Sequence, residues 1–126
     1  MIRLDEILKA AGEPTRLRIL NLLRRGSICV CDLQAVLDLP QPTVSRHLAA
    51  LRHAGLVLDF REGPRVLYSL APATTVQARA FHEFLRKVCP EEPQLQADFR
   101  ALEKALAQGE CTVLERKNIV GIEASE

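Results

Sequence analysis

The sequence has few of the features on which secreted and membrane proteins depend. It contains no tryptophan and only four cysteines in 126 residues, and it has no run of about 18 apolar residues, the length needed to cross a membrane. The first ten residues, MIRLDEILKA, include four charged side chains and do not form the apolar region of a secretory signal. We therefore expect a cytoplasmic protein with no membrane partner, whose cysteines are free thiols or metal ligands instead of a disulfide framework.

Signatures of enzymes are also lacking. The sequence has no Gly-rich phosphate loop, no usefully spaced pair of carboxylates and no nucleophile motif, and its three histidines are scattered. An enzyme is therefore not expected. The length fits one domain, which we place at residues 1–108, followed by a tail at 109–126 whose structure the sequence does not predict.

Neither sign of charge dominates, because the net charge is only +1. The distribution is uneven, however. Residues 14–65 contain eight arginines and four acidic residues, whereas residues 90–126 contain eight acidic and four basic residues. This split is small enough to arise by chance, but it favours a first half that faces an anionic partner.

Hydrophobic periodicity predicts a mainly α-helical chain with one small β-hairpin. Apolar residues recur at helical spacing in six segments, and between the fourth and the fifth the period changes to two on either side of the turn REGPR. The predicted helices span about residues 4–12, 14–26, 31–40, 42–55, 72–88 and 94–108, and the hairpin spans residues 56–70.

The segment QPTVSRHLAALRHAGL is the most informative part of the chain. Val44, Leu48 and Leu51 form its buried stripe, which leaves Gln, Thr, Ser and Arg side chains outside, where a merely solvated helix favours Lys and Glu. Two helices with a tight turn, followed by a hairpin, is the order of a winged helix-turn-helix domain, whose second helix enters the DNA major groove. We therefore predict a winged helix-turn-helix fold, mainly α with a small β-hairpin.

Four segments of the sequence resemble the ArsR/SmtB family of metal-responsive repressors, most closely its arsenic-responsive ArsR branch. They are EPTRLRILNLL, CVCDL, QPTVSRHLAALRHAGLV and GPRVLYSL, and they lie within about residues 4–72. The resemblance implies a homodimeric repressor of double-stranded operator DNA that needs no cofactor to bind DNA; it implies no protein partner. It also implies a dimer interface made by the first helix and by the helix after the hairpin, with candidate residues Leu4, Ile7, Leu8, Val76, Ala80 and Phe84.

Candidate DNA-binding residues follow from their chemistry within this fold. Amide, hydroxyl and guanidinium groups near the start of the 42–55 helix suit base edges and phosphates, and arginines at the hairpin tip suit backbone phosphates or the minor groove. The candidates are Gln41, Thr43, Ser45, Arg46, His47, Arg52, Arg61 and Arg65. For His47, packing beside the turn is an equally good interpretation. Many relatives have a serine where Pro40 stands, so here either Gln41 caps the helix or its first amides bind phosphate.

Cys29 and Cys31 are the candidate inducer ligands. Residues two apart on a helix point to nearly opposite sides, so the two sulfurs can bind one ion only at a bend. With Cys29 in the loop and Cys31 in the first turn of the third helix, we expect modest unwinding to let both sulfurs converge. We also expect low thiol pKa values at this helix start. A thiolate pair selects soft ions, and the resemblance to the arsenic-responsive branch implies arsenite or antimonite as the inducer. Binding would distort the helix that supports the DNA-reading helix.

The third ligand and the inducer leave alternatives open. Arsenite prefers three thiolates, and some relatives have a third cysteine where this chain has Gln34, so Cys89, Cys111 or a cellular thiol is the candidate. Cys89 and Cys111 forming a separate site is another hypothesis. A redox or persulfide switch on the same fold is the first alternative function, followed by a zinc or cadmium sensor, for which His82 lacks the paired ligands of zinc-sensing relatives. A winged helix that binds a protein instead of DNA is the last.

Overall fold

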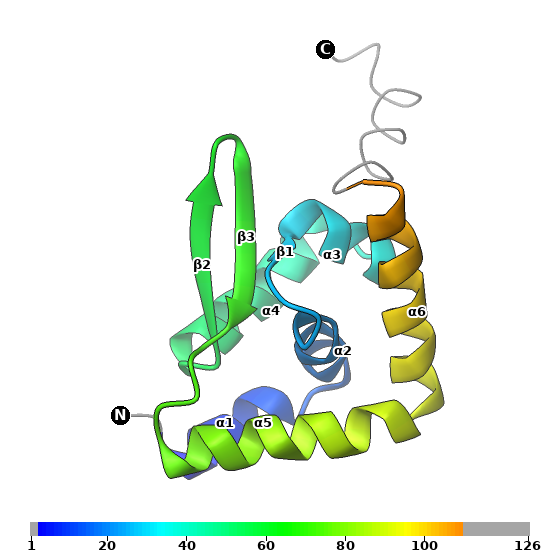
Figure 1. Cartoon of the computed structure of the whole chain (residues 1–126). Coiled ribbons are helices and arrows are strands. Elements are labelled where there is room, and N and C mark those ends of the chain that lie inside the picture. Colours follow the sequence, from blue (N-terminus) through cyan, green and yellow to red (C-terminus); the bar gives the residue numbers. More distant parts are fainter. Residues whose placement is uncertain (1–2, 110–126) are drawn as a thin grey trace.

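The computed structural model describes residues 3–109 of the chain (Figure 1). Its elements are, in order, α1 (Leu4–Ala11), α2 (Pro14–Leu23), β1 (Ile28–Cys29), α3 (Val30–Leu37), α4 (Gln41–His53), β2 (Val57–Glu62), β3 (Arg65–Leu70), α5 (Val76–Val88), the 3-10 helix η1 (Cys89–Glu91) and α6 (Pro93–Ala107). The predicted tail lies, apart from Gly109, outside the described residues, so the domain boundary at residue 108 stays a prediction.

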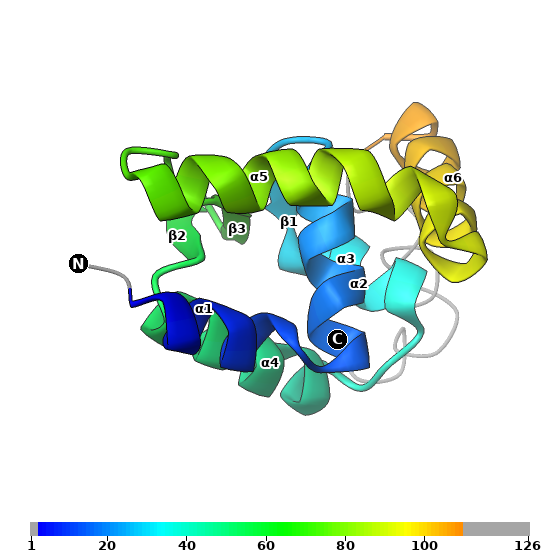
Figure 2. The same ribbon diagram turned by 90° about the horizontal axis from the view of Figure 1, so that it is seen from below.

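Helix α2 forms the centre of the fold. Its residues Ile19, Leu20 and Leu22 are all 0% exposed, because α1, α4 and α6 pack around it (Figure 2). The β2–β3 hairpin stands on one side of this core and α6 on the other (Figure 1). Among the described helices, none is both long enough and apolar enough to cross a membrane.

The sheet has three antiparallel strands in the order β1-β3-β2, whereas the sequence predicted a two-stranded hairpin. The additional strand pairs Ile28 with Tyr68 and Cys29 with Leu67. A strand of two residues has no alternation for a periodicity argument to detect, and it forms here because β3 offers a free edge. Its presence attaches Cys29 directly to the hairpin.

Several predicted helix boundaries are wrong. Helix α2 ends at Leu23 instead of residue 26. Helix α5 begins at Val76 instead of residue 72, since Thr75 caps it by accepting a hydrogen bond from the amide of Ala78 at 3.0 Å. Helix α3 ends at Leu37 instead of residue 40, because Asp38 adopts the left-handed conformation with a φ of 55°. That early end gives the α3–α4 connection its tight turn.

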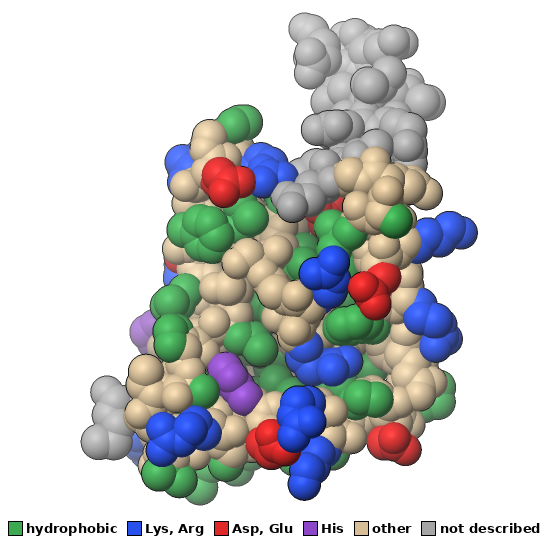
Figure 3. Space-filling view, in the orientation of Figure 1, with side chains coloured by type: hydrophobic (Ala, Val, Ile, Leu, Met, Phe, Trp, Pro, Cys, Tyr) green, Lys and Arg blue, Asp and Glu red, His purple; other side chains and the backbone are tan. Residues whose placement is uncertain are grey.

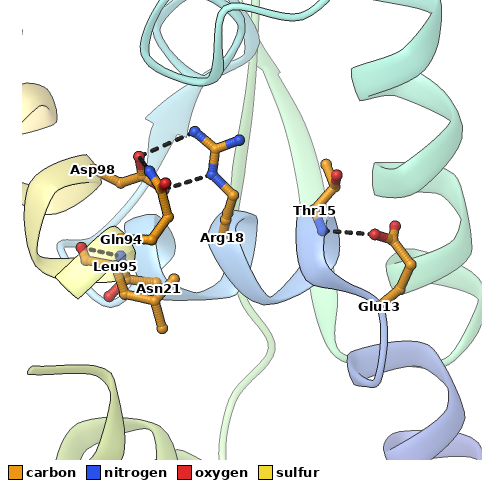
Figure 4. A network of polar contacts seen from close by, with 7 residues as sticks. All are labelled: Glu13, Thr15, Arg18, Asn21, Gln94, Leu95 and Asp98. Carbon is orange, nitrogen blue, oxygen red and sulfur yellow. Dashed lines mark hydrogen bonds and ion pairs between the residues drawn. The ribbon is translucent and has the colours of Figure 1, made fainter. Parts of the chain in front are cut away.

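A polar network fixes α6 against α2 (Figure 4). Arg18 of α2 donates to both carboxylate oxygens of Asp98 at 2.7 and 3.1 Å, and Gln94 donates to the same carboxylate at 2.9 Å. Beside them, Asn21 donates to the carbonyl of Leu95 at 2.8 Å. Asp98 is 4% exposed, so its charge is compensated by these donors and not by water.

Candidate DNA interface and cysteine pair

Helix α4 presents the face that the sequence predicted. Val44, Leu48 and Leu51 are each 0% exposed and attach the helix to the core. The predicted DNA-contacting residues on this helix lie away from that stripe, with Gln41, Arg46 and Arg52 exposed and Thr43, Ser45 and His47 half-buried. The outer face is therefore built from side chains that can hydrogen-bond to bases and phosphates.

The start of α4 has no side-chain cap. Pro40 occupies the N-cap position, and the Gln41 amide donates instead to the Ser45 hydroxyl at 2.6 Å. Capping by Gln41, one of the two predicted alternatives, is therefore wrong. The other alternative, a phosphate at the first amides of the helix, is consistent with the uncapped start.

The two arginines of α4 have different surroundings. Arg52 forms an ion pair with Asp59 of β2 at 3.0 Å, so it joins α4 to the hairpin. Arg46 is exposed, and within residues 3–109 it forms no ion pair or hydrogen bond. Of the two, Arg46 is the better placed for a phosphate or a guanine, because it need not give up a partner.

His47 is held between helices. Its Nδ1 lies 3.0 Å from Glu13 Oε2 and 3.2 Å from Arg16 Nε, and its side chain is 12% exposed. Glu13 in turn caps α2 by accepting from the Thr15 amide at 2.6 Å (Figure 4). This position favours the packing interpretation of His47, in which it fixes α4 against the start of α2.

At the tip of the β2–β3 hairpin, basic side chains lie beside an acidic one in the space-filling view (Figure 3). Gly63 forms the turn with a φ of 62°, a conformation that glycine adopts without strain. Arg61 is exposed, whereas Arg65 donates to Glu62 at 2.5 Å with its side chain 29% exposed. Both predicted arginines therefore lie at the tip.

The structure brings Cys29 and Cys31 together, with their Sγ atoms 2.7 Å apart. Cys29 is the N-cap residue of α3 and has an extended backbone with φ −67° and ψ 140°, while Cys31 lies in the first helical turn. The expected unwinding of the helix is therefore unnecessary, because the extended backbone at Cys29 already turns its side chain toward Cys31. The sequence argument missed Leu67 of β3, whose side chain packs with both cysteines.

The predicted low pKa at this helix start is wrong for Cys29. Burial raises the pKa of its thiol, and the nearby Asp32 carboxylate acts in the same direction, against the backbone amide of Cys31 and the charge of Arg65. Cys29 is 4% exposed, so desolvation of the thiolate outweighs the helix terminus.

Cys89 lies in a different environment, in η1 at the start of α6. It is 1% exposed, and burial raises the pKa of its thiol while the neighbouring Arg24 opposes this effect. The guanidinium of Arg24 also stacks on Phe99 of α6 at 4.7 Å. Cys89 is thus part of the α2–α6 junction. Among residues 3–109, no three His, Cys, Asp or Glu side chains form a metal-binding group.

Helices α1 and α5 line an apolar groove of about 350 Å³. Four of its side chains are large and exposed, namely Leu4 at 59%, Leu8 at 59%, Val76 at 70% and Phe84 at 53%. Ala80 lies exposed between them, and Ile7, at 1% exposure, forms the floor. All the predicted dimer residues therefore line one groove.

A tight pair of helices with a polar outer face, followed by a hairpin with basic side chains at its tip, defines a winged helix-turn-helix protein. Residues 13–58 match the family described as bacterial regulatory protein, arsR family. Over 99 residues the chain is 37% identical to the arsenic resistance transcriptional regulator ArsR2 of Pseudomonas putida, which is 78% of this chain and 84% of that protein. The chain belongs to the ArsR family.

Two further comparisons agree with this assignment. The chain is 48% identical over 68 residues to the arsenical resistance operon repressor of Escherichia coli, which covers 53% of this chain and 58% of that protein. The solved structure of HlyU from Vibrio cholerae matches with a TM-score of 0.59 at 35% identity, covering 66% of this chain and 87% of that chain. The winged helix-turn-helix fold and the family resemblance are thereby confirmed.

Proposed function

We propose that this chain is a cytoplasmic, homodimeric repressor of a metalloid-resistance operon, released from DNA when trivalent arsenic or antimony binds Cys29 and Cys31. The observation that carries the proposal is the convergence of the two sulfurs, 2.7 Å apart, at a point where α3 meets the hairpin. The Escherichia coli and Pseudomonas putida relatives are both regulators of arsenic resistance by name, which supports this inducer.

In this proposal α4 enters the major groove and the hairpin tip lies over the adjacent backbone. Gln41, Thr43 and Ser45 reach base edges or phosphates, Arg46 takes a guanine or a phosphate, and Arg61 and Arg65 hold the backbone. A second copy of the chain covers the α1–α5 groove. The dimer then presents two α4 helices about 34 to 36 Å apart, on successive turns of a palindromic operator.

Release follows from the connections of the two cysteines. The backbone of Cys29 pairs with Leu67 of the hairpin, and Cys31 lies in the first turn of α3, the helix that precedes α4. An ion bound by both sulfurs must sit between these two elements, so it changes the position of the hairpin relative to α4. By linkage, DNA and the ion then weaken each other by the same factor, typically about 1 to 3 kcal/mol.

The experiment measures fluorescence anisotropy of the DNA upstream of the protein's own gene, titrated with the protein at several salt concentrations. We expect tight, salt-dependent binding and its loss on addition of arsenite. Cys29→Ser and Cys31→Ser should bind DNA as the wild type does and stay bound in arsenite. Release of Cys29→Ser at the wild-type arsenite concentration would refute the assigned site.

Two arginine variants test the DNA-binding face separately. Arg46→Ala should weaken DNA binding by about tenfold through loss of a charged contact, whereas Arg100→Ala, an exposed arginine on α6, should leave it unchanged. Equal affinities for the two variants would contradict the proposed orientation of α4.

A thiol redox switch is the second candidate, because two sulfurs so close together also suit oxidation. The raised pKa and the burial of Cys29 disfavour it, since the thiolate is the species that peroxide attacks. Hydrogen peroxide in place of arsenite separates the two candidates. Release by peroxide, with sulfenate or disulfide at Cys29 or Cys31 found by mass spectrometry, would favour the redox switch.

A further inference from the structure

We infer that His47 is a positioning residue of the DNA-reading helix α4, that protonation switches its partner from Arg16 to Glu13, and that DNA binding is therefore tighter at lower pH. The inference rests on the DNA-binding part of the proposed function and does not involve the inducer. It goes beyond the packing interpretation of His47, because it assigns two alternative states to the contact between α4 and the start of α2.

The Nδ1 atom of His47 has two neighbours that make opposite demands on it. Arg16 Nε lies 3.2 Å away and donates a hydrogen bond to Nδ1, and a guanidinium group can only donate. Glu13 Oε2 lies 3.0 Å away, and an ionised carboxylate can only accept. An imidazole nitrogen carries either a lone pair or a proton. Nδ1 therefore bonds to Arg16 when it is unprotonated and to Glu13 when it is protonated.

The structure has the first of these two arrangements, which leaves the Glu13 carboxylate incompletely bonded. Glu13 Oε1 accepts from the Thr15 amide at 2.6 Å (Figure 4), but Oε2 is buried and accepts no hydrogen bond within residues 3–109. Arg16 Nε lies 4.0 Å from Oε2, too far for a hydrogen bond. A buried carboxylate oxygen without a donor is unfavourable. Protonation of His47 supplies the missing donor, because the Nδ1–H group can then turn toward Oε2.

No other charged group in the described part of the chain bonds to His47. Helix α4 packs against α1, α2, α3 and β2. On α2 the remaining charged residue, Arg18, pairs with Asp98, and on β2 Asp59 pairs with Arg52. The other charged residues of these elements and of the α3 C-cap are Asp5, Glu6, Lys9, Asp32, Asp38, Arg61 and Glu62. None of them forms a hydrogen bond or an ion pair with His47, so Glu13 and Arg16 set its protonation.

Protonation of His47 changes the charge and the attachment of the DNA-reading helix. His47 follows Thr43 by one turn of α4, so the two side chains lie on the same side of the helix, and the proposed function places Thr43 on the DNA. The protonated ring adds a positive charge at this position, which a polyanion favours. Its charged hydrogen bond to Glu13 also holds α4 more firmly on the N-cap of α2.

The sign of the pH dependence follows from linkage. If DNA binds the protonated protein more tightly, DNA binding takes up a proton, and the affinity rises as the pH falls through the range in which histidine side chains ordinarily titrate. The other two histidines are His53 and His82. His53 is also on α4 and is exposed, so it provides a matched control for the titration of a histidine on the same helix.

The test measures the anisotropy of the DNA upstream of the protein's own gene, titrated with the full chain at fixed salt from about pH 8 to about pH 6. The wild-type dissociation constant should fall by about threefold to tenfold. His47→Gln cannot take up a proton, so its dissociation constant should change by less than about twofold, whereas His53→Gln should keep the wild-type pH dependence. Because each variant is compared with itself at different pH, a uniform loss of affinity does not imitate this result.

Glu13→Gln distinguishes positioning from a direct contact between His47 and DNA. The glutamine oxygen can still accept from the Thr15 amide, but its NH2 group then faces Nδ1 and disfavours the protonated ring. We expect this variant to lose the pH dependence of DNA binding, although residue 13 lies on the cap of α2 and not on α4. If Glu13→Gln keeps the pH dependence that His47→Gln loses, His47 binds DNA itself and the inference is wrong.

NMR of the histidine side chains gives a readout that does not depend on affinity. At high pH the ring nitrogen shifts of His47 should show the Nε2–H tautomer, because Nδ1 accepts from Arg16. The midpoint of the His47 titration should move to higher pH when DNA is added, as linkage requires, and to lower pH in Glu13→Gln. An Nδ1–H tautomer at high pH would overturn the assignment of the two states.

The outcomes separate the inference from the proposed function. If the wild type binds the DNA equally tightly across the pH range, or if His47→Gln keeps the wild-type pH dependence, the inference is wrong and the DNA-binding proposal stands. If the wild type binds this DNA at no pH in the range, the DNA-binding part of the proposed function fails and the inference fails with it.

Discussion

Cys29 and Cys89 are both almost fully buried, and burial raises the pKa of both thiols, yet their surroundings differ. Cys89 sits in a closed junction where α2 and α6 exchange charged hydrogen bonds and an arginine stacks on Phe99. Cys29 lies 2.7 Å from a second sulfur, beside a three-stranded sheet that extends into the hairpin. Burial therefore does not distinguish the proposed inducer ligand from the thiol of the α2–α6 junction; the second sulfur and the sheet beside Cys29 do.

The same contrast extends to the rest of the molecule. The α2–α6 junction satisfies its polar groups internally, whereas the α1–α5 groove, the outer face of α4 and the hairpin tip leave apolar or charged groups facing outward. We expect substitutions in the closed junction to reduce stability without changing the response to arsenite. Substitutions on the open surfaces should instead change self-association or DNA binding and leave the stability of the fold nearly unchanged.

The largest expected effect is on self-association. Leu8→Glu places a carboxylate in the α1–α5 groove, where a second copy would bury it without a partner, and should raise the dimer dissociation constant by about 100-fold or more. Leu58→Glu is the matched control, because Leu58 is similarly exposed, at 48%, but lies on β2 outside the groove. Analytical ultracentrifugation distinguishes the two. A Leu8→Glu protein that still dimerises as tightly as Leu58→Glu would move the interface elsewhere.

The next effect tests the closed junction. Asp98→Ala removes the acceptor of Arg18 and Gln94 and should lower the free energy of unfolding by about 2 to 3 kcal/mol, because hydrogen bonds to a buried charge are lost. Glu103→Ala breaks the exposed Arg25–Glu103 pair at 3.2 Å and should cost less than about 1 kcal/mol. Urea unfolding measures both. Equal losses would show that the Asp98 network is no stronger than a surface ion pair.

Much of the difference between the closed junction and the open surfaces could be predicted from the sequence, but the surroundings of Cys29 could not. The stripe of Val44, Leu48 and Leu51 has helical spacing, so it identified α4 and its outer face. The β1 strand could not be predicted, because a strand of two residues has no periodicity. Its pairing also depends on β3, which lies almost 40 residues away in the chain. The convergence of the cysteine sulfurs depends on this strand. The sequence argument therefore expected some unwinding to bring the sulfurs together, whereas the extended N-cap residue Cys29 already does so.

The sequence also did not predict the environment of individual titratable or charged side chains. The helix terminus alone suggested a low thiol pKa at Cys29, whereas burial between β3 and α3 decides its direction. His47 could be a DNA ligand or a packing residue by sequence, and only the approach of Glu13 favours packing. Such effects come from residues distant in sequence, which a local pattern does not contain.

The smallest effect gives the sharpest test of the comparison. Cys89→Ala removes one buried sulfur and should lower the free energy of unfolding by about 1 kcal/mol, as expected for a small cavity, while operator release occurs at the wild-type arsenite concentration. Cys29→Ala makes the same substitution at an equally buried thiol, but it should abolish release, since a ligand is lost together with the cavity. Urea unfolding gives the free energy of unfolding of each variant, and the anisotropy of labelled operator DNA gives the arsenite concentration at which each variant is released. If Cys89→Ala also shifts the arsenite dose for release by about tenfold or more, a change of 1.4 kcal/mol, then the α2–α6 junction takes part in sensing and the two buried thiols are not separate in function.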